Sequence, residues 1–285
     1  MADIRLIRRR IRGIQSTAKI TRAMEMIAAS KMRRAQERGL AGRPYSEKIS
    51  QVLAALAALP QAGDSLHSLL QCRPVTKIAI VHITPDRGLC GGLIANINRR
   101  TASVILEQTV PVTLIAVGRK GLDFMRRYGR DIRAEFTRLG DRPSLLDTLP
   151  ISRIIIDDYT SGVIDLVYLA YTQFISTMTQ RPILQQLLPV EPATIPEAQN
   201  VDYIYEPSSA LVLGELLPRF VEMQVFHAIL ESIASEQSAR MVAMRNATDN
   251  ANELTDELTL MYNKARQELI TKELLDITGG VVALA

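Results

Sequence analysis

The chain has 285 residues, of which 47% are apolar and 22% charged, ordinary values for a protein that buries a core. Its 13 Pro and 15 Gly are too few for a disordered or fibrous protein, and a net charge of +4 is too small for the whole surface to bind polyanions. No uncharged apolar run reaches membrane-spanning length, no secretory signal pattern begins the chain, and Cys72 and Cys90 form no C-x-x-C pair, so we expect a cytosolic protein with reduced thiols.

The N-terminal segment has the spacing of a helix. Isoleucines at 4, 7, 11 and 14 step by three and four, and we expect the apolar stripe to continue through Ala18, Ile20, Met24, Ile27 and Met32. Asp3 is the expected N-cap, and Pro44 with Gly39 and Gly42 predicts a kink or stop before an Ala-rich stretch at 52–59 resumes the helix.

The middle of the chain alternates strand and helix patterns. Strands are expected at 77–84, 112–117, 164–171 and 182–190, and helices at 94–108, 121–128 and 144–159. This order predicts a Rossmann-like α/β domain over residues 75–190. The Pro-rich residues 191–207 are expected to form a linker with one small strand.

The C-terminal third has a heptad seam, a series of mostly apolar residues separated alternately by three and four positions. Its members are Leu216, Phe220, Met223, His227, Leu230, Ala234, Gln237, Met241, Met244, Thr248, Ala251, Thr255, Leu258, Tyr262, Ala265 and Leu269. No Gly or Pro occurs between Pro218 and Gly279, so one very long helix is expected over 208–285. A helix of this length needs a partner, and the helix of residues 1–60 has the same need, so the two should pair as an antiparallel coiled coil.

Little in the sequence indicates catalysis. The turn motif Asp86, Arg87, Gly88, Leu89, Cys90, Gly91, Gly92 follows the first strand, where α/β folds often bind phosphate, but it matches no nucleotide-binding pattern. We interpret its glycines as serving a tight turn and close helix packing. The three histidines are isolated, and Asp157 and Asp158 are expected to be solvated, so we expect no active site, metal or cofactor.

Charge leaves an alternative open. Residues 1–43 hold twelve Lys/Arg against three Asp/Glu, a balance of +9, so the remaining residues carry −5. A basic coiled coil of this kind could bind nucleic acid or act as a scaffold. The basic residues share 4–38 with an apolar stripe, whereas a basic-zipper protein separates the two, so a charged partner protein or a solvated face is also compatible with the pattern.

Five segments resemble the gamma subunit of the F-type ATP synthase almost from end to end. They are KITRAMEMIAASKMRRAQ at 19–36, DRGLCGG at 86–92, YIYEP at 203–207, ASEQSARMVAMRNATDNA at 234–251 and YNKARQELITKEL at 262–274. The resemblance implies a non-catalytic rotor, with the coiled coil as central stalk inside a ring of three alpha and three beta subunits. The α/β domain would then sit at the foot, against the epsilon subunit and the membrane c-ring, on the cytoplasmic face of the cell membrane. Rotation would couple proton flow to ATP synthesis or hydrolysis at the beta subunits, with no nucleic acid and no small-molecule substrate of its own.

The resemblance also implies contact residues. Arg266 and Gln267 resemble a pair that grips a beta-subunit loop, Thr271 and Arg240 lie in the neighbouring zone, and Met24 resembles a methionine near the beta lever segment. Tyr203, Tyr205 and Glu206 resemble part of the foot that faces the epsilon subunit and the membrane ring.

Two sequence features bear on how this chain compares with other members of the family that it resembles. Gly280 and Val281 stand where the family usually has Gly-Ala near the end of the shaft. The chain also has no insertion with a close cysteine pair, so the thiol switch of the chloroplast form is not expected, and a bacterial type is.

Overall fold

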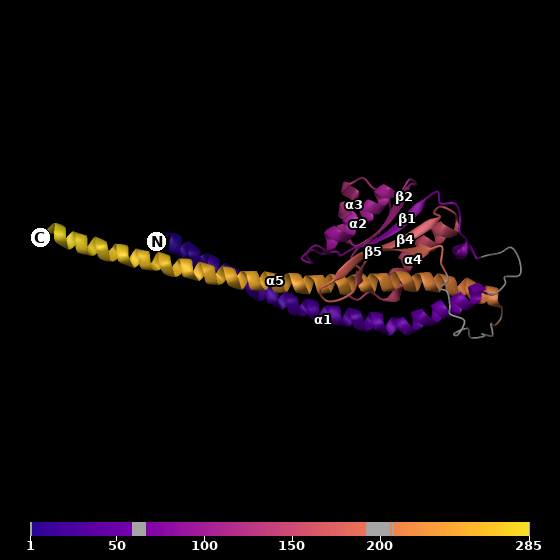
Figure 1. Cartoon of the computed structure of the whole chain (residues 1–285), viewed down its shortest axis with the longest axis horizontal. Coiled ribbons are helices and arrows are strands. Elements are labelled where there is room, and N and C mark those ends of the chain that lie inside the picture. The colour runs from indigo at the N-terminus through magenta and orange to yellow at the C-terminus, as the bar shows by residue number, and fades with distance from the viewer. Residues whose placement is uncertain (1, 59–66, 192–205, 207, 285) are drawn as a thin grey trace. The chain divides into compact units, whose positions relative to one another are not determined.

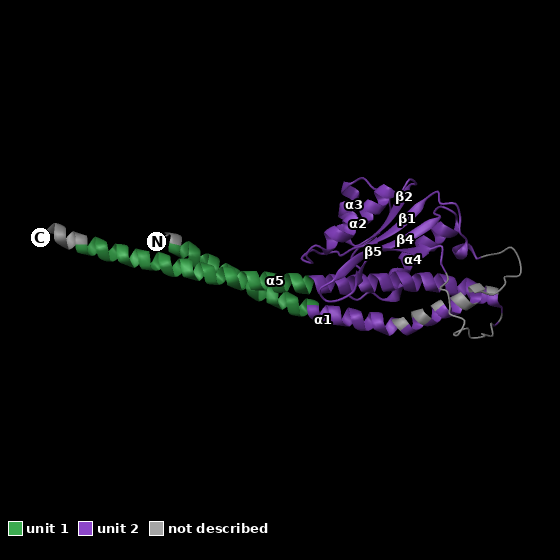
Figure 2. Cartoon of the chain, viewed as in Figure 1, with its two compact units in different colours: residues 1–28, 240–285 green, residues 29–239 purple. Residues whose placement is uncertain are grey.

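A computed structural model describes residues 2–58, 67–191, 206 and 208–284 (Figure 1). The chain divides into two compact units (Figure 2). Unit 1 consists of residues 1–28 and 240–285, and unit 2 consists of residues 29–239. Two long helices, α1 (Ala2–Ala58) and α5 (Ser209–Leu284), contribute to both units.

Unit 1 is an antiparallel pair of helices from the two ends of the chain. The hydroxyl oxygens of Thr21 and Thr248 lie 2.7 Å apart in a buried hydrogen bond, and the Arg245 Nε donates to the Glu25 Oε1 at 2.9 Å. Glu25 follows Thr21 in α1, whereas its partner Arg245 precedes Thr248 in α5, so the two helices run in opposite directions. The predicted antiparallel coiled coil is confirmed.

None of the sixteen members of the heptad seam predicted for α5 is exposed, and the seam is confirmed from Leu230 to Ala251, where every member except the half-buried Met241 is buried. Closer to the start of the helix, the fully buried positions are Leu217, Val221 and Val225, which lie beside the predicted seam. The seam predicted for α1 is correct up to Ala18 and half-buried at Met24 and Met32, but it is wrong at Ile20 and Ile27, which are 58% and 55% exposed. The buried positions that follow Ala18 are small or polar: Thr21, Ala28 and Ala35. Small side chains let two helix backbones approach closely, and Thr21 satisfies its hydroxyl across the interface.

The ends and breaks predicted for α1 also differ from the structure. The helix continues through Pro44 to Ala58, so a stop at Pro44 is wrong. A proline inside a helix removes one backbone hydrogen bond, a cost that packing can offset. The helix already includes Ala2, which places Asp3 in the first turn rather than at the N-cap.

Unit 2 contains a five-stranded sheet in the order β3-β2-β1-β4-β5. Its strands are β1 (Ile78–Ile83), β2 (Val112–Val117), β3 (Ile132–Phe136), β4 (Leu166–Phe174) and β5 (Gln180–Leu188). The first four in the order are parallel to their neighbours, and β5 returns antiparallel to β4 through a hairpin. The predicted Rossmann-like α/β fold is confirmed, but β3 was not predicted, although its IRAEF sequence alternates as expected of a half-buried strand.

Helices cover both faces of this sheet, as the alternation of side chains along a strand requires. The helices α2 (Leu93–Glu107) and α3 (Arg119–Arg127) lie on one face of the sheet, and α4 (Leu145–Thr160) and α5 lie on the other (Figure 1). Ile78 and Ile80 of β1 belong to the core with α2 and α3, and Ala79 and Val81 belong to the core with α4 and α5. A short 3-10 turn, Ser68–Leu70, adds Leu69 to this second core. The small strand predicted within 191–207 falls almost wholly outside the described residues.

One histidine is buried at the centre of the sheet. His82 of β1 is fully buried, and its ring nitrogens lie 2.9 Å from the Asn98 Oδ1 and 3.1 Å from the Thr101 Oγ1 of α2. Burial lowers its pKa to about 4, although the hydrogen bond to Asn98 opposes the shift. His82 is therefore neutral at pH 7, with one nitrogen donating and the other accepting.

This burial predicts a loss of stability in mild acid. The unfolded chain binds a proton at His82 below pH 6.5 and the folded chain only below about pH 4, so the free energy of unfolding falls as pH drops through that window. Between pH 7 and pH 4.5, His82 should account for about 2 kcal/mol of the loss. Denaturant unfolding should show this excess over His82→Gln, which cannot titrate; equal losses in the two proteins would contradict it.

Candidate functional site

The candidate beta-subunit contacts at the end of α5 are fully available at the surface. Arg266, Gln267 and Thr271 are all exposed, and the Thr271 hydroxyl donates to the Gln267 carbonyl at 2.9 Å. Because Thr21 lies opposite Thr248, the antiparallel register places Ala2 level with Gln267. Beyond that level, α5 has no described residue of α1 beside it within unit 1.

The other two candidates lie elsewhere along unit 1. Met24 of α1 is half-buried beside the Glu25–Arg245 pair, and Arg240 of α5 is also half-buried. At 1.5 Å per residue, Arg266 lies about 30 Å along α5 from Arg245. The five candidates therefore form no single site, and occupy separate levels along the two helices.

Large apolar side chains remain exposed on unit 1. Ile270, Leu274 and Ile277 follow one stripe of α5 at helical spacing, and Ile277 is 65% exposed. On α1, Ile20 and Ile27 form a second stripe outside the seam. Contiguous exposed apolar residues of this kind mark interaction surfaces.

Charge divides unit 1 unequally between its helices. The first turns of α1 expose Arg5, Arg8, Arg9, Arg10 and Arg12. On α5, the stretch that is level with residues 12–20 of α1 exposes Asp249, Glu253, Asp256 and Glu257. One helix thus presents a basic face and the other an acidic face to whatever surrounds them.

The candidate foot is described only in part. Glu206 is exposed just before α5. Tyr203 and Tyr205 lie outside the described residues, as do the side chains of Gly280 and Val281.

The turn motif at 86–92 is built around Asp86. Its Oδ1 accepts the backbone N–H of Arg119 at 2.9 Å, where α3 begins, and its Oδ2 accepts that of Arg138 at 3.0 Å, after β3. One carboxylate therefore ties together the loops that follow three parallel strands. It also places negative charge at the start of α3, where the helix dipole favours an anion.

The glycines of this motif have different roles. Gly91 has φ +59°, a conformation that favours glycine, whereas Leu89 reaches φ +64° without being one. Arg87 is exposed, Cys90 is buried, and Gly92 precedes α2, where its carbonyl accepts the N–H of Asn96. The interpretation of a tight turn holds for Gly91, while Gly88 and Gly92 need no left-handed backbone.

Two buried carboxylates were not foreseen. Asp158 is not solvated: it is buried and accepts two hydrogen bonds from Arg133, at 3.1 and 3.2 Å. Asp165 accepts the hydroxyl and N–H of Thr76 and the N–H of Lys77, and these bonds, first that from the Thr76 hydroxyl, hold its pKa below the ordinary value. The residues that donate to these carboxylates, Arg133 in β3 and Thr76 and Lys77 just before β1, are distant from them in sequence. No local sequence pattern therefore reveals either interaction.

The role of Asp86 leads to a direct test. Asp86→Ala removes the acceptor of two backbone amides and should cost about 1.5–3 kcal/mol, the range for a hydrogen bond to a charged group. Amide hydrogen exchange should accelerate at Arg119 and Arg138. Asp123→Ala, on the exposed side of α3, is the matched control and should leave both amides protected. Unchanged exchange in Asp86→Ala would remove Asp86 from this role.

Comparison with known proteins agrees with these features. The sequence profile of the ATP synthase family matches residues 3–284. The ATP synthase gamma chain of Dehalococcoides mccartyi is 70% identical over 285 residues, which is 100% of both chains.

Solved structures give the same result. A chain from the central stalk and c-ring of the Tetrahymena thermophila mitochondrial ATP synthase superposes with a TM-score of 0.61 at 25% identity, covering 80% of this chain and 99% of its own. A chain of the Euglena gracilis mitochondrial ATP synthase shares the fold with a TM-score of 0.69 at 21% identity, covering 99% and 95%. The resemblance found in the sequence is confirmed, and the chain belongs to the ATP synthase gamma chain family.

Proposed function

We propose that this chain is the rotor of an ATP synthase complex, and that it works by presenting unequal surfaces to three equal neighbours. Nucleotide chemistry belongs to the beta subunits, and the chain itself has no catalytic role. Its 70% identity over full length to a gamma chain is the observation that carries the proposal.

The asymmetry of unit 1 supplies the physical basis. A ligand shifts a conformational equilibrium only by its differential affinity for the two states, so identical beta subunits respond differently only if they meet different faces. Moving one subunit from mostly closed to mostly open takes about 5.5 kcal/mol. The basic face of α1, the acidic face of α5 and the exposed apolar stripes offer such differences.

Specific partners follow from the same proposal. Three alpha and three beta subunits would surround unit 1, with Arg266, Gln267, Thr271, Arg240 and Met24 in contact with beta. The epsilon subunit and the membrane c-ring would meet the foot, including Tyr203, Tyr205 and Glu206. The apolar stripe Ile270, Leu274 and Ile277 would then be covered by the ring of partners.

We also propose a peripheral position at the cytoplasmic face of the cell membrane. Within the described part of the chain, no helix is both long and apolar enough to cross a bilayer. Attachment would therefore depend on the partner subunits at the foot. The alternative of a nucleic-acid-binding or scaffolding protein finds no support among the relatives.

The contact role of Arg266 is tested by Arg266→Ala. A charge-paired contact made in one orientation of the rotor can supply a few kcal/mol, so its loss should lower coupled ATP turnover by about tenfold or more. Helix content should not change, because Arg266 is exposed and alanine is a good helix former.

Lys264→Ala provides the control on the same helix. Lys264 is also exposed and lies about 200° around the helix from Arg266. Turnover and proton pumping by the reconstituted complex should fall in Arg266→Ala and stay near wild type in Lys264→Ala. Equal losses in both variants would show that net charge, and not a specific contact, is responsible.

Assembly offers a separate test of the function itself. Native mass measurement of the purified complex should find one copy of this chain with three copies of each ring subunit. A complex without that stoichiometry, or saturable ATP binding by the isolated chain, would count against the rotor.

A further inference from the structure

A cavity of about 380 Å³ lies within unit 2, and nothing in the rotor mechanism uses it. Four residues of α1 between Lys31 and Arg38 form one wall, residues 139–142 after β3 form another, and Leu230 of α5 completes the lining. We call it the arginine cavity. Its volume lies within the range of small-molecule sites.

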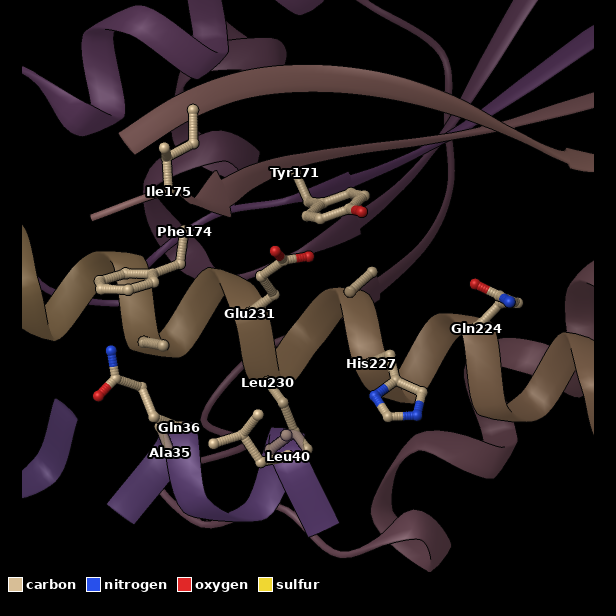
Figure 3. A pocket seen from close by; sticks show the side chains of 13 residues that line it. Ala35, Gln36, Leu40, Tyr171, Phe174, Ile175, Gln224, His227, Leu230 and Glu231 are labelled. Atoms are coloured by element: carbon tan, nitrogen blue, oxygen red, sulfur yellow. The ribbon is translucent and has the colours of Figure 1, made fainter. Parts of the chain in front are cut away.

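Apolar side chains supply the part of the lining that lies between α1 and α5. Ala35 and Leu230 are both buried, and Figure 3 shows Leu230 extending from α5 toward α1, where Ala35 lies. These two residues also line a larger groove of about 640 Å³, so they form an apolar boundary that the two hollows share. Together with the half-buried Leu139, they offer a hydrocarbon surface against which a small organic molecule can pack.

Positive charge exceeds negative charge around the arginine cavity. Its basic lining residues are Lys31, Arg34, Arg38 and Arg142, and its one acidic lining residue is Asp141. The Lys31 Nζ and the Asp141 Oδ2 lie 2.6 Å apart, so these two charges balance each other. The positive charge of the three guanidinium groups remains.

The three arginines differ in how they are held. The Arg34 Nε donates to the Ser30 carbonyl at 3.2 Å and its Nη2 to the Ser30 Oγ at 3.0 Å, which orients the guanidinium and leaves further N–H groups for a ligand. Arg38 lies one turn later on the same side of α1. In the part of the chain that the structure describes, no carboxylate pairs with Arg38 or Arg142. Like charges around one small cavity repel one another, and an anion that binds between them relieves this repulsion.

We propose that the arginine cavity binds a small organic polycarboxylate, with two or three carboxylate groups joined by a short hydrocarbon chain. The carboxylates would pair with Arg34, Arg38 and Arg142, since a planar guanidinium can donate two parallel hydrogen bonds to one carboxylate. The hydrocarbon chain would lie against Leu139 and Leu230. This apolar surface favours a polycarboxylate over an inorganic anion, which has no hydrocarbon to pack there.

Four probes test the chemical class. Tricarballylate, glutarate and butyrate carry three, two and one negative charges on short hydrocarbon chains, and sulfate carries two charges without a chain. Isothermal titration calorimetry of the full chain at low ionic strength measures their dissociation constants. Tricarballylate should bind saturably, glutarate about threefold more weakly, and butyrate and sulfate more weakly still. Absence of saturable tricarballylate binding, or sulfate binding as tight as that of glutarate, would overturn the proposal.

Two variants locate the site. Arg38→Gln and Arg142→Gln each remove one charge from the cavity and should weaken tricarballylate binding about threefold or more, the effect expected of an exposed ion pair. Arg33→Gln is the matched control, because Arg33 is also an exposed arginine of α1 but does not line the cavity.

The control separates a specific site from general attraction of anions. Tricarballylate affinity should fall in Arg38→Gln and Arg142→Gln and stay near wild type in Arg33→Gln, with helix content unchanged in all three because the side chains are exposed. Equal losses in the three variants would show that net charge alone attracts the anion. Undiminished binding in the double variant, Arg38→Gln with Arg142→Gln, would place the anion elsewhere. Either result would overturn the proposal.

Discussion

The structure depends on one constraint: the apolar stripe of a very long helix must find partners, and in this chain it does so along most of α5. Hydrophobic burial is the main favourable term in folding, and an isolated helix has nothing against which to bury its seam. In unit 1 the other end of the chain supplies the partner, with Ala18 and Ala28 allowing close approach and Thr21–Thr248 fixing the register. Each threonine also has a backbone carbonyl within reach, so the hydroxyls stay satisfied inside an otherwise apolar interface.

Unit 2 satisfies the same constraint in another way. There α5 serves as part of the layer that covers one face of the sheet, through Leu217, Val221 and Val225. Polar contacts hold it in place: the buried Ser235 hydroxyl donates to the Thr172 carbonyl at 2.9 Å, and that of Ser238 to the Thr177 carbonyl at 2.8 Å. One helix thus serves a coiled coil and a sheet domain, and it buries a neighbouring set of residues, Leu217, Val221 and Val225, against the sheet.

The surfaces left over after this burial are what a rotor can use. The basic face of α1 and the acidic face of α5 remain exposed because the seam itself consists of small and apolar residues. Because the small residues Thr21 and Ala28 occupy the interface, Ile20 and Ile27 remain outside the core. Features that stabilise nothing within this chain are the ones through which neighbouring subunits could distinguish its sides.

The sequence by itself determined the long helices, the heptad seam of α5, the antiparallel pairing and most of the sheet, because periodicity reports which face of an element is buried. It also identified the family and, through it, the contact residues, whose roles stay predictions. It misplaced the α1 seam at Ile20 and Ile27, which are exposed while the smaller Thr21 and Ala28 beside them are buried, because apolarity alone does not say which of two stripes faces the partner. Only the tertiary structure revealed the Asp86 tie between three loops and the Arg133–Asp158 pair. Each joins residues distant in sequence, and such contacts are decided by how the elements pack and not by any local pattern.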